Sequence, residues 1–421
     1  MAFPYYPKMN LIYSLIVSLV WFLSTYFNVV FLLALLSRKD ELLKFPKLKG
    51  NQELPKVSII VPAYNEESTI EQSIASLNKI DYPKDKLEII IVNDGSRDNT
   101  GKIVNGLKGR SILFIDNKDN KGKAARLNQG IEESTGELIA CMDADSEVQS
   151  DILKKTTPYF RNKKIGAVTV TVEVKDAKNF LQKIVAVEYA IGLSLFLKVL
   201  SYFSAVHVTP GPFSIYKKEV LEKIGRFDTK SIVEDLEIAY RLQKGGYRIA
   251  CCIATKVRTI TPETFKSLHK QRKRWYSGAI YTIIKHRNVV LNSKIGYFSY
   301  IVPYVFLLIF LGLFLFAFSV YLGVYHLIRS ISFFSLTNFN FLSYMTLNKF
   351  DFLTLSTLSF FGITAIATTI LSMYICMKLS SIKIKKNLAG VVGFPFIFFL
   401  YQIFWASSIL AVILRKKVGW K

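Results

Sequence analysis

The chain carries two kinds of hydrophobic pattern. In four segments, long apolar stretches contain no Asp, Glu, Lys or Arg, and each exceeds the roughly 20 residues needed to cross a bilayer core. These segments are residues 11–36, 295–328, 352–377 and 388–414. Core helices of soluble proteins rarely stay uncharged over such lengths. The pattern therefore predicts membrane-spanning helices, the first of them a retained anchor because it is too long for a signal peptide.

The central part of the chain has shorter apolar runs. Runs rich in β-branched residues, each followed by a polar loop, occupy residues 57–62, 87–92, 112–115 and 137–142. Apolar residues at helical spacing lie between them, at 67–79 and 124–134. Such alternation predicts a parallel α/β sheet with ligands at the carboxyl ends of its strands. No G-x-G-x-x-G occurs, which disfavours the dinucleotide-binding version of this architecture.

Residues 180–206 need a separate interpretation. Their uncharged centre, residues 189–197, is too short to span a bilayer, and Lys183 and Lys198 flank a very apolar body. A helix of this kind is typical of the membrane interface. The alternative is an ordinary buried helix, and the sequence leaves both open.

Charge adds an orientation and a class of partner. Lys8 alone precedes the first span, whereas Arg38, Lys39, Lys44, Lys47 and Lys49 follow it, which predicts a cytoplasmic location for residues 37–294. The formal net charge is +24. No nucleic-acid-binding module is recognisable, so we expect anionic lipid headgroups and nucleotide diphosphates, and no nucleic acid, as the partners.

The side on which the C-terminus lies stays open. Three spans after residue 294 leave Arg415, Lys416 and Lys417 outside, against the usual bias. A further pass through residues 331–347 would return them inside, but this polar-rich segment is more typical of an interfacial or re-entrant piece. The four cysteines show no metal-binding spacing, and buried thiols in a reducing compartment are expected.

Polar constellations follow the predicted strands in a fixed order. They are Ser58–Glu66 (SIIVPAYNE), Asp94 in VNDGS, Asp143-Ala144-Asp145, Glu234-Asp235 in SIVEDLE, and Gln271-Arg272-Lys273-Arg274-Trp275. A single D-x-D carries little information, but the ordered set is specific. It resembles the family 2 glycosyltransferases. The Q-x-x-R-W element is similar to that of the membrane branch, which holds the synthases of hyaluronan, chitin, cellulose and poly-N-acetylglucosamine. The resemblance covers residues 55–280 and implies a GT-A fold, an α/β sheet that binds nucleotide-diphosphosugars.

Paired carboxylates supply the expected catalytic chemistry. Asp143 and Asp145 at the end of a strand suit one hard divalent ion, Mg²⁺ or Mn²⁺, with phosphate oxygens and water completing the shell. The resemblance implies that Asp145 is a metal ligand, and that Asp143 contacts the metal, the diphosphate or the ribose. It also implies that Asp235 is the general base on the acceptor hydroxyl, with Glu234 beside it in the binding site. Val233 stands where the family usually has Thr.

The remaining candidates bind substrate. Arg274 suits bidentate contact with the diphosphate, and Trp275 suits stacking with a sugar ring. Gln271 completes their motif, and Arg272 and Lys273 are expected to add positive charge at the site. The resemblance implies that the nucleotide is bound by Tyr64, Glu66, Asp94 and Lys123. Asn93 replaces the first acid of the usual D-D-G-S.

These observations favour a multi-pass cell-membrane enzyme. The expected parts are an N-terminal span in residues 1–36, a cytoplasmic GT-A domain in 37–294 with an interface helix near 180–206, and a C-terminal region of about three spans in 295–421. The expected reaction is inverting transfer from a UDP-sugar to a growing polysaccharide, in a processive manner. The alternatives are transfer of one sugar to a lipid acceptor and a non-enzymatic sugar-nucleotide sensor.

Overall fold

The computed structural model describes residues 9–37, 40, 44–47, 54–107, 112–336, 357–379 and 388–415. The chain forms two compact units. One comprises Met1–Leu33 and Tyr304–Tyr374, and its described part is built from apolar helices. The other comprises Ala34–Pro303 and Ile375–Lys421 and contains the α/β fold.

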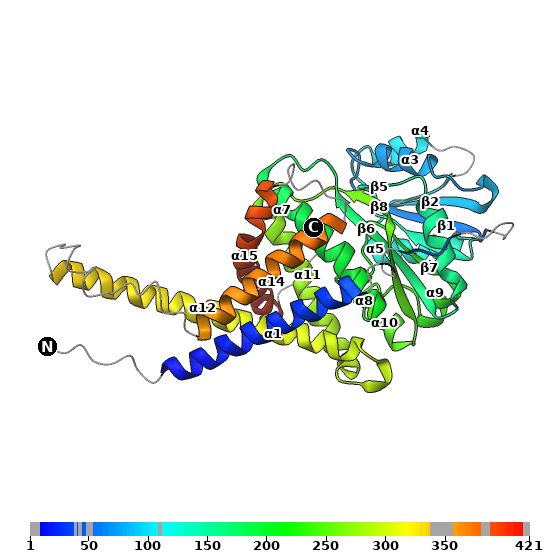
Figure 1. Ribbon diagram of the computed structural model, residues 1–421. Helices are drawn as coiled ribbons and strands as arrows, with labels where there is room; N and C mark the ends of the chain where they lie inside the picture. The colour runs from blue at the N-terminus through cyan, green and yellow to red at the C-terminus, as the bar shows by residue number, and fades with distance from the viewer. Residues whose placement is uncertain are drawn as a thin grey trace. The chain divides into compact units, whose positions relative to one another are not determined.

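A mixed eight-stranded sheet forms the core of the α/β unit, in the order β3-β2-β1-β4-β7-β6-β8-β5 (Figure 1). The strands are β1 Val57–Ala63, β2 Leu87–Asp94, β3 Ile112–Asn117, β4 Leu138–Cys141, β5 Ser146–Val148, β6 Ile165–Val174, β7 Ser214–Lys217 and β8 Arg248–Thr259. The first four strands pair in parallel, as their alternation with helices predicts. Their carboxyl ends therefore meet at one edge of the sheet.

The second half of the sheet departs from the parallel prediction. Strand β7 is antiparallel to both β4 and β6, and β5 is antiparallel to β8. Strands β5 and β7 have only three and four residues. Runs this short are too brief for apolar periodicity to reveal a strand or its direction.

Helices cover the sheet and border its carboxyl edge. They are α3 Ile70–Asn78, α4 Thr100–Leu107, α5 Lys123–Glu133, α6 Ile152–Thr156, α7 Phe180–Ala190, α8 Leu197–Tyr202, α9 Lys218–Ile224, α10 Glu234–Lys244, α11 Phe265–Lys285 and α15 Leu388–Ile413. Single turns are η1 Lys84–Lys86, η2 Thr157–Arg161, η4 Arg287–Val289 and η5 Ser293–Ile295, and η3 Ile191–Phe196 is π-helical. Helix α11 begins after Thr264, which forms a capping box with Ser267.

The last helix, α15, packs on α7 and α11 within the α/β unit (Figure 1). At Gly390 an added Cβ would lie 2.3 Å from the Lys183 carbonyl oxygen, so the two helix backbones almost touch. Tyr276 of α11 stacks on Trp405 of α15 with ring centroids 4.1 Å apart. One face of α15 therefore packs against α11. The uncharged sequence of α15 does not indicate this packing.

Helices α7, η3 and α8 follow one another along residues 180–202. They pack against β6 and β8 as well as α15, and 61% of their most apolar window is buried inside the structure. This burial is what the ordinary-helix alternative predicts. Contact of the same segment with a membrane surface stays a prediction.

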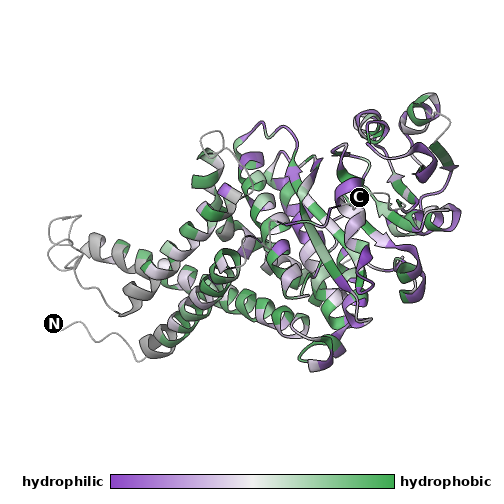
Figure 2. Ribbon diagram, turned by 45° about the vertical axis from the view of Figure 1, so that its right-hand side comes forward, coloured by the Kyte–Doolittle hydropathy of each residue, from purple (hydrophilic) through white to green (hydrophobic). Residues whose placement is uncertain are grey.

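Among the described residues, three helices are long and apolar enough to cross a membrane: Leu15–Ser37 in α1 (Met9–Ser37), Phe180–Tyr202, and Phe298–Tyr325 in α12 (Phe298–Leu336). A fourth is counted if α15, bent by 43°, is one span. Figure 2 shows α1 and α12 as largely hydrophobic. Helix α14 (Thr357–Leu379) has a shorter apolar stretch, Ile366–Ile375. Residues 337–347 of the expected re-entrant piece lie outside the described residues.

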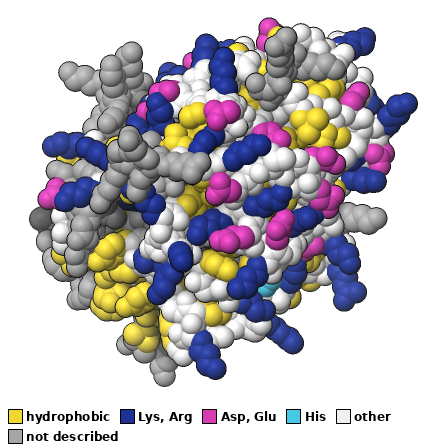
Figure 3. All heavy atoms as spheres, turned by 90° about the vertical axis from the view of Figure 1, so that its right-hand side faces the viewer, with side chains coloured by type: hydrophobic (Ala, Val, Ile, Leu, Met, Phe, Trp, Pro, Cys, Tyr) yellow, Lys and Arg dark blue, Asp and Glu magenta, His cyan; other side chains and the backbone are white. Residues whose placement is uncertain are grey.

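The outer face of the α/β unit in Figure 3 carries Lys and Arg side chains interspersed with Asp and Glu. Ion pairs in the α/β unit include Lys154 with Asp81 at 2.6 Å and Arg226 with Glu132 at 2.5 Å. Exposed pairs of this kind stabilise a fold by at most about 1 kcal/mol each. The positive excess of the chain is therefore not gathered into one basic stripe on this face.

Candidate active site

A cavity of about 460 Å³ lies at the carboxyl ends of β1, β2 and β4, bordered by α10 and α11. Eleven of the candidate site residues named from the sequence line it, whereas Arg272 and Lys273 do not: the eleven are Tyr64, Glu66, Asp94, Lys123, Asp143, Asp145, Glu234, Asp235, Gln271, Arg274 and Trp275. Segments that are more than 200 residues apart in the sequence therefore converge on one space. Their roles in catalysis and binding stay predictions.

The loops after β1 and β2 are tied together at the edge of the cavity. Asn65 has a left-handed backbone with φ 54°, which Asn adopts more readily than most residues. Its backbone N–H donates to Ser96 Oγ at 2.9 Å, and its side-chain oxygen accepts from the Arg97 N–H at 2.9 Å. This turn places Tyr64 and Glu66, on either side of Asn65, along the cavity wall.

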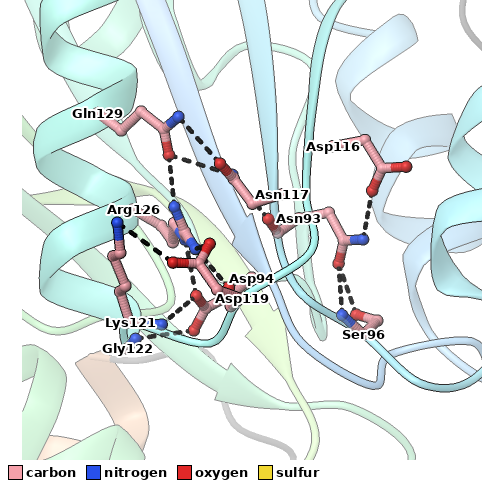
Figure 4. Close-up of polar contacts among 10 residues, drawn as sticks. All are labelled: Asn93, Asp94, Ser96, Asp116, Asn117, Asp119, Lys121, Gly122, Arg126 and Gln129. Carbon is pink, nitrogen blue, oxygen red and sulfur yellow. Dashed lines mark hydrogen bonds and ion pairs between the residues drawn. The ribbon is translucent and has the colours of Figure 1, made fainter.

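Asp94 anchors the loop that leads into α5 (Figure 4). Its carboxylate accepts hydrogen bonds from the backbone N–H groups of Lys121 and Gly122, at 2.8 and 2.9 Å, and from Arg126 Nε at 2.6 Å. Arg126 is buried, and it also donates to Asp119. Asp94 thus lines the cavity where a nucleotide is expected, and it also shapes the turn that delivers Lys123.

The departure at Asn93 has a local explanation (Figure 4). Its side-chain nitrogen donates to Asp116 Oδ1 at 2.6 Å, and its oxygen accepts from Ser96 Oγ at 2.6 Å. An acid at position 93 would face Asp116 with like charge. Asparagine therefore suits this sheet, in which Asp116 stands opposite position 93 on β3.

Lys123 joins two carboxylates at the floor of the cavity. Its ammonium lies 2.5 Å from Asp143 Oδ1 and 2.8 Å from Glu234 Oε1. Burial alone would lower the pKa of Lys123, but these two carboxylates outweigh it and raise the pKa well above the ordinary value. Burial would likewise raise the pKa of Glu234, yet the charge of Lys123 lowers it. Lys123 and Glu234 are therefore both ionised near neutral pH.

Gly211 allows this arrangement. A Cβ on Gly211 would lie 2.8 Å from both Lys123 Nζ and Asp143 Oδ2. Any side chain there would displace the ion pair. The segment of residues 210–214, whose Pro and Gly content predicts a rigid turn, therefore brings its backbone directly against the acidic groups.

Asp145 is the more strongly perturbed acid of the D-x-D pair. Burial raises its pKa to about 7, and the charges of Asp143 and Glu66 add to the effect. Its Oδ1 accepts hydrogen bonds from Ser146 and Thr259 at 3.1 and 3.2 Å. Carboxylates crowded in this way create a negative site that a divalent cation would relieve.

The donor set restricts how such a cation would be held. Among the described residues, no group of three or more His, Cys, Asp or Glu side chains is arranged to hold a metal ion. Asp143 is also engaged by Lys123. Asp145 and Asp143 therefore fit a metal whose other ligands come from a diphosphate and water, as the sequence predicts.

Asp235 is the second residue of α10, and only one of its two carboxylate oxygens accepts a hydrogen bond among the described residues. Oδ2 accepts from the Gly211 N–H at 3.3 Å. Oδ1 is buried and has no hydrogen-bond partner among the described residues. Burial raises the pKa of Asp235 to about 7, helped by the neighbouring charge of Glu234. A carboxylate that lines the cavity, with a pKa near neutrality and one oxygen without a hydrogen bond, suits a general base.

Helix α11 presents Gln271, Arg274 and Trp275 to the cavity, at the i, i+3, i+4 spacing of one helix face. Gln271 Oε1 is buried without a hydrogen-bond partner in the described structure, so it is available to a ligand. Arg272 differs from expectation because it does not line the cavity. It is 1% exposed and pairs with Glu188 at 2.8 Å.

Tyr189 of α7 also lines the cavity and was not among the predicted site residues. Its ring lies 6.4 Å from that of Trp275, with an interplanar angle of 27°. In the sequence, Tyr189 sits within an apolar run that indicates only packing or membrane contact. Its single local signal is the neighbouring Glu188, a charge inside that run.

Comparison with known proteins shows a family match over part of the chain. Residues 58–225 match the family described as Glycosyl transferase family 2. Over 249 residues, 58% of this chain, the sequence is 32% identical to the poly-beta-1,6-N-acetyl-D-glucosamine synthase of Staphylococcus aureus (strain COL). The enzyme of that name from Staphylococcus epidermidis is 31% identical over 246 residues. The match spans 59% of the length of each relative.

A solved structure shares the fold. The mannosyltransferase PcManGT from Pyrobaculum calidifontis, in complex with GDP-Man and Mn²⁺, aligns with 95% of this chain and 100% of its own at a TM-score of 0.57. The two sequences are 19% identical, so the likeness concerns the fold alone. The predicted GT-A fold is confirmed.

Proposed function

We propose that the chain is a membrane-integrated, inverting glycosyltransferase that transfers a sugar from a UDP-sugar to a growing polysaccharide. The match of residues 58–225 to Glycosyl transferase family 2 supports the class of reaction. The observation that carries the proposal is the buried Oδ1 of Asp235, which has no hydrogen-bond partner among the described residues. Asp235 lines the same cavity as the D-x-D pair and as Gln271, Arg274 and Trp275. The likeness to poly-N-acetylglucosamine synthases supports a polysaccharide product.

In the proposed reaction, Asp235 takes the proton from an acceptor hydroxyl. The hydroxyl oxygen attacks the anomeric carbon while the bond from that carbon to the diphosphate breaks and UDP leaves. Arg274 and Lys123 are placed to bind the negative diphosphate, and a positioned base with aligned reactants accounts for large rate gains. A divalent ion bound by Asp145 and Asp143 would stabilise the charge on the leaving group. One base, with no second nucleophile in the scheme, gives inversion.

The aromatic side of the cavity supports a sugar acceptor. Trp275 and Tyr189 offer ring surface beside Asp235, and sugars bind aromatic faces through their C–H groups. Transfer of a single sugar to a lipid acceptor is the competing function. The long apolar helices support membrane integration, and the charges that flank α1 support a cytoplasmic catalytic part.

Asp235→Asn tests the proposed base. Asparagine keeps the shape of the side chain but cannot accept a proton, so transfer should fall by about 10²–10⁴-fold. UDP binding should stay close to wild type, because the base acts on the acceptor. Near wild-type turnover by this variant would remove Asp235 from the mechanism.

A further inference from the structure

Helix α11 meets the start of α10 at a glycine. A Cβ added to Gly278 would lie 2.1 Å from Val233 Cγ2 and 2.9 Å from Val233 Cβ. Glycine inside a helix costs about 1 kcal/mol relative to alanine, so its presence there calls for a packing reason. The close approach of Val233 is that reason, since Val233 is buried and its branched side chain has few rotamers.

Both partners adjoin functional groups. Val233 is the N-cap of α10 and immediately precedes Glu234 and Asp235. Gly278 lies three residues after Trp275 and four after Arg274, so it is one turn further along the same side of α11. The contact thus lies between the proposed base and the residues proposed to bind the substrates.

A second contact joins the same two helices. The Glu237 carboxylate, on α10, is 1% exposed and accepts from Lys285 at 2.8 Å and from His286 at 3.0 Å, at the end of α11. Burial would raise the pKa of Glu237, but its hydrogen bonds with His286, Arg241 and Lys285 lower it to about 2. Glu237 is therefore ionised at neutral pH and connects the end of α11 to α10. We call its contacts with Lys285 and His286 the Glu237 latch.

We propose that the Val233–Gly278 contact and the Glu237 latch together set the position of Asp235 relative to Arg274 and Trp275. Two contacts spaced along both helices fix their separation and their rotation, which a single contact does not. Val233 and Gly278 are then positioning residues for the transfer step. The inference rests on the proposed role of Asp235 as base. It also gives a use to valine at position 233, where its family has threonine: the shape of the side chain, and not a hydroxyl, is needed.

Gly278→Ala and Val233→Ala test this in a double-mutant cycle. The alanine methyl in Gly278→Ala would push the helices apart by about 1 Å, and a misplacement of that size costs up to about 10²-fold in kcat. KM for the UDP-sugar should change less than kcat, because only Arg274 among the expected donor contacts lies on α11, whereas Tyr64, Glu66 and Asp94 do not move with it. Val233→Ala alone removes the contacting Cγ2 atom and should lower kcat severalfold. The double variant should recover most of kcat, because removal of Cγ2 makes room for the methyl.

Gly106→Ala is the matched control. Gly106 also lies in a helix, α4, but a Cβ there meets nothing within 4 Å, so kcat should stay at the wild-type value. Lys285→Met gives an independent test at the other contact and should lower kcat severalfold, with a smaller change in KM for the donor. It carries the test if Gly278→Ala does not fold.

Wild-type kcat in both Gly278→Ala and Lys285→Met, or a loss in Gly278→Ala that Val233→Ala does not restore, would overturn the inference. An active Asp235→Asn would instead overturn the assignment of the base, whatever the outcome of the cycle.

Discussion

Arg272 stacks on Trp275, with its guanidinium carbon 4.1 Å from the centroid of the Trp275 ring. The cation is buried, and Glu188, which pairs with it at 2.8 Å, also accepts a hydrogen bond from Tyr401 of α15 at 2.5 Å. Arg272 therefore connects α7, α11 and α15 directly behind the ring that lines the cavity. Its contribution to the site is the placement of Trp275.

Arg272→Lys should weaken acceptor binding and leave donor binding unchanged. Lysine keeps the charge beside Glu188 but lacks the planar group that stacks on the indole. Loss of a buried cation–π contact costs about 2 kcal/mol, or roughly a 30-fold rise in KM for the acceptor. Steady-state kinetics with each substrate varied in turn measure this. Lys273→Gln, which removes a neighbouring charge on the same helix, should behave as wild type, and an equal rise in both KM values would contradict the placement role.

Asp145→Ala should abolish the dependence of UDP binding on a divalent ion. The acid is buried beside Asp143 and Glu66, so its removal relieves the negative charge that a cation would otherwise neutralise. Excess chelator should weaken UDP binding by the wild type to the level of the variant. Calorimetric titration with and without Mn²⁺ decides the point. Full wild-type activity in chelator would show that the D-x-D pair does not bind a required metal.

The rate of transfer should depend on the ionisation of Asp235. Its pKa is raised to about 7 by burial and by Glu234, and a base works only when deprotonated. kcat should therefore be constant above about pH 8 and fall by about tenfold per pH unit well below pH 7. Glu234 adds no step in this range because its pKa is lowered.

The pKa of Asp145 is also raised to about 7, so the titrations of Asp145 and Asp235 have to be distinguished. Varying the metal concentration does this. Protons compete with a metal for Asp145, so its contribution should vanish at saturating Mn²⁺. The fall in kcat below pH 7 that is due to Asp235 should remain at saturating Mn²⁺. A pH profile that becomes flat in excess Mn²⁺ would transfer the titration to the metal site.

The location of the site follows from the sequence because of the sheet. Parallel strands bring their carboxyl ends to one edge, so Asp94 after β2 and Asp143 after β4 had to lie close together. The α10 and α11 residues were predicted by resemblance alone, since nothing in their local pattern specifies which edge of the sheet they border.

Contacts between distant segments were not predictable in the same way. Arg126 pairs with Asp94, and the Tyr189 ring lies near that of Trp275. The spacing of apolar residues along the chain does not indicate such contacts between separate segments. Arg272 directly follows Gln271, but consecutive residues of a helix point in different directions. The Arg272 side chain is therefore buried beside Glu188 and not in the cavity. The burial of one face of α15 was hidden for another reason: a helix that is apolar on every side gives no signal of the side that packs.

Trp275→Ala should lower polymer formation more than UDP release. In the proposed reaction its ring holds the terminal sugar of the acceptor in register, and such stacking is worth roughly 0.5–1.5 kcal/mol beyond buried area. The measured quantity is the ratio of sugar incorporated to UDP released, in the wild type and in the variant. An unchanged ratio would favour a role for Trp275 in lipid-acceptor affinity.

The size of the product tests the central claim most directly. Purified full-length protein in detergent is incubated with UDP-N-acetylglucosamine and Mg²⁺ or Mn²⁺, then with a panel of other UDP-sugars, and products are sized by gel and mass spectrometry. Asp235→Asn serves as the inactive control. A polysaccharide synthase should give a ladder or a high-mass smear that depends on Asp235. A product that is only a lipid carrying one sugar would contradict it.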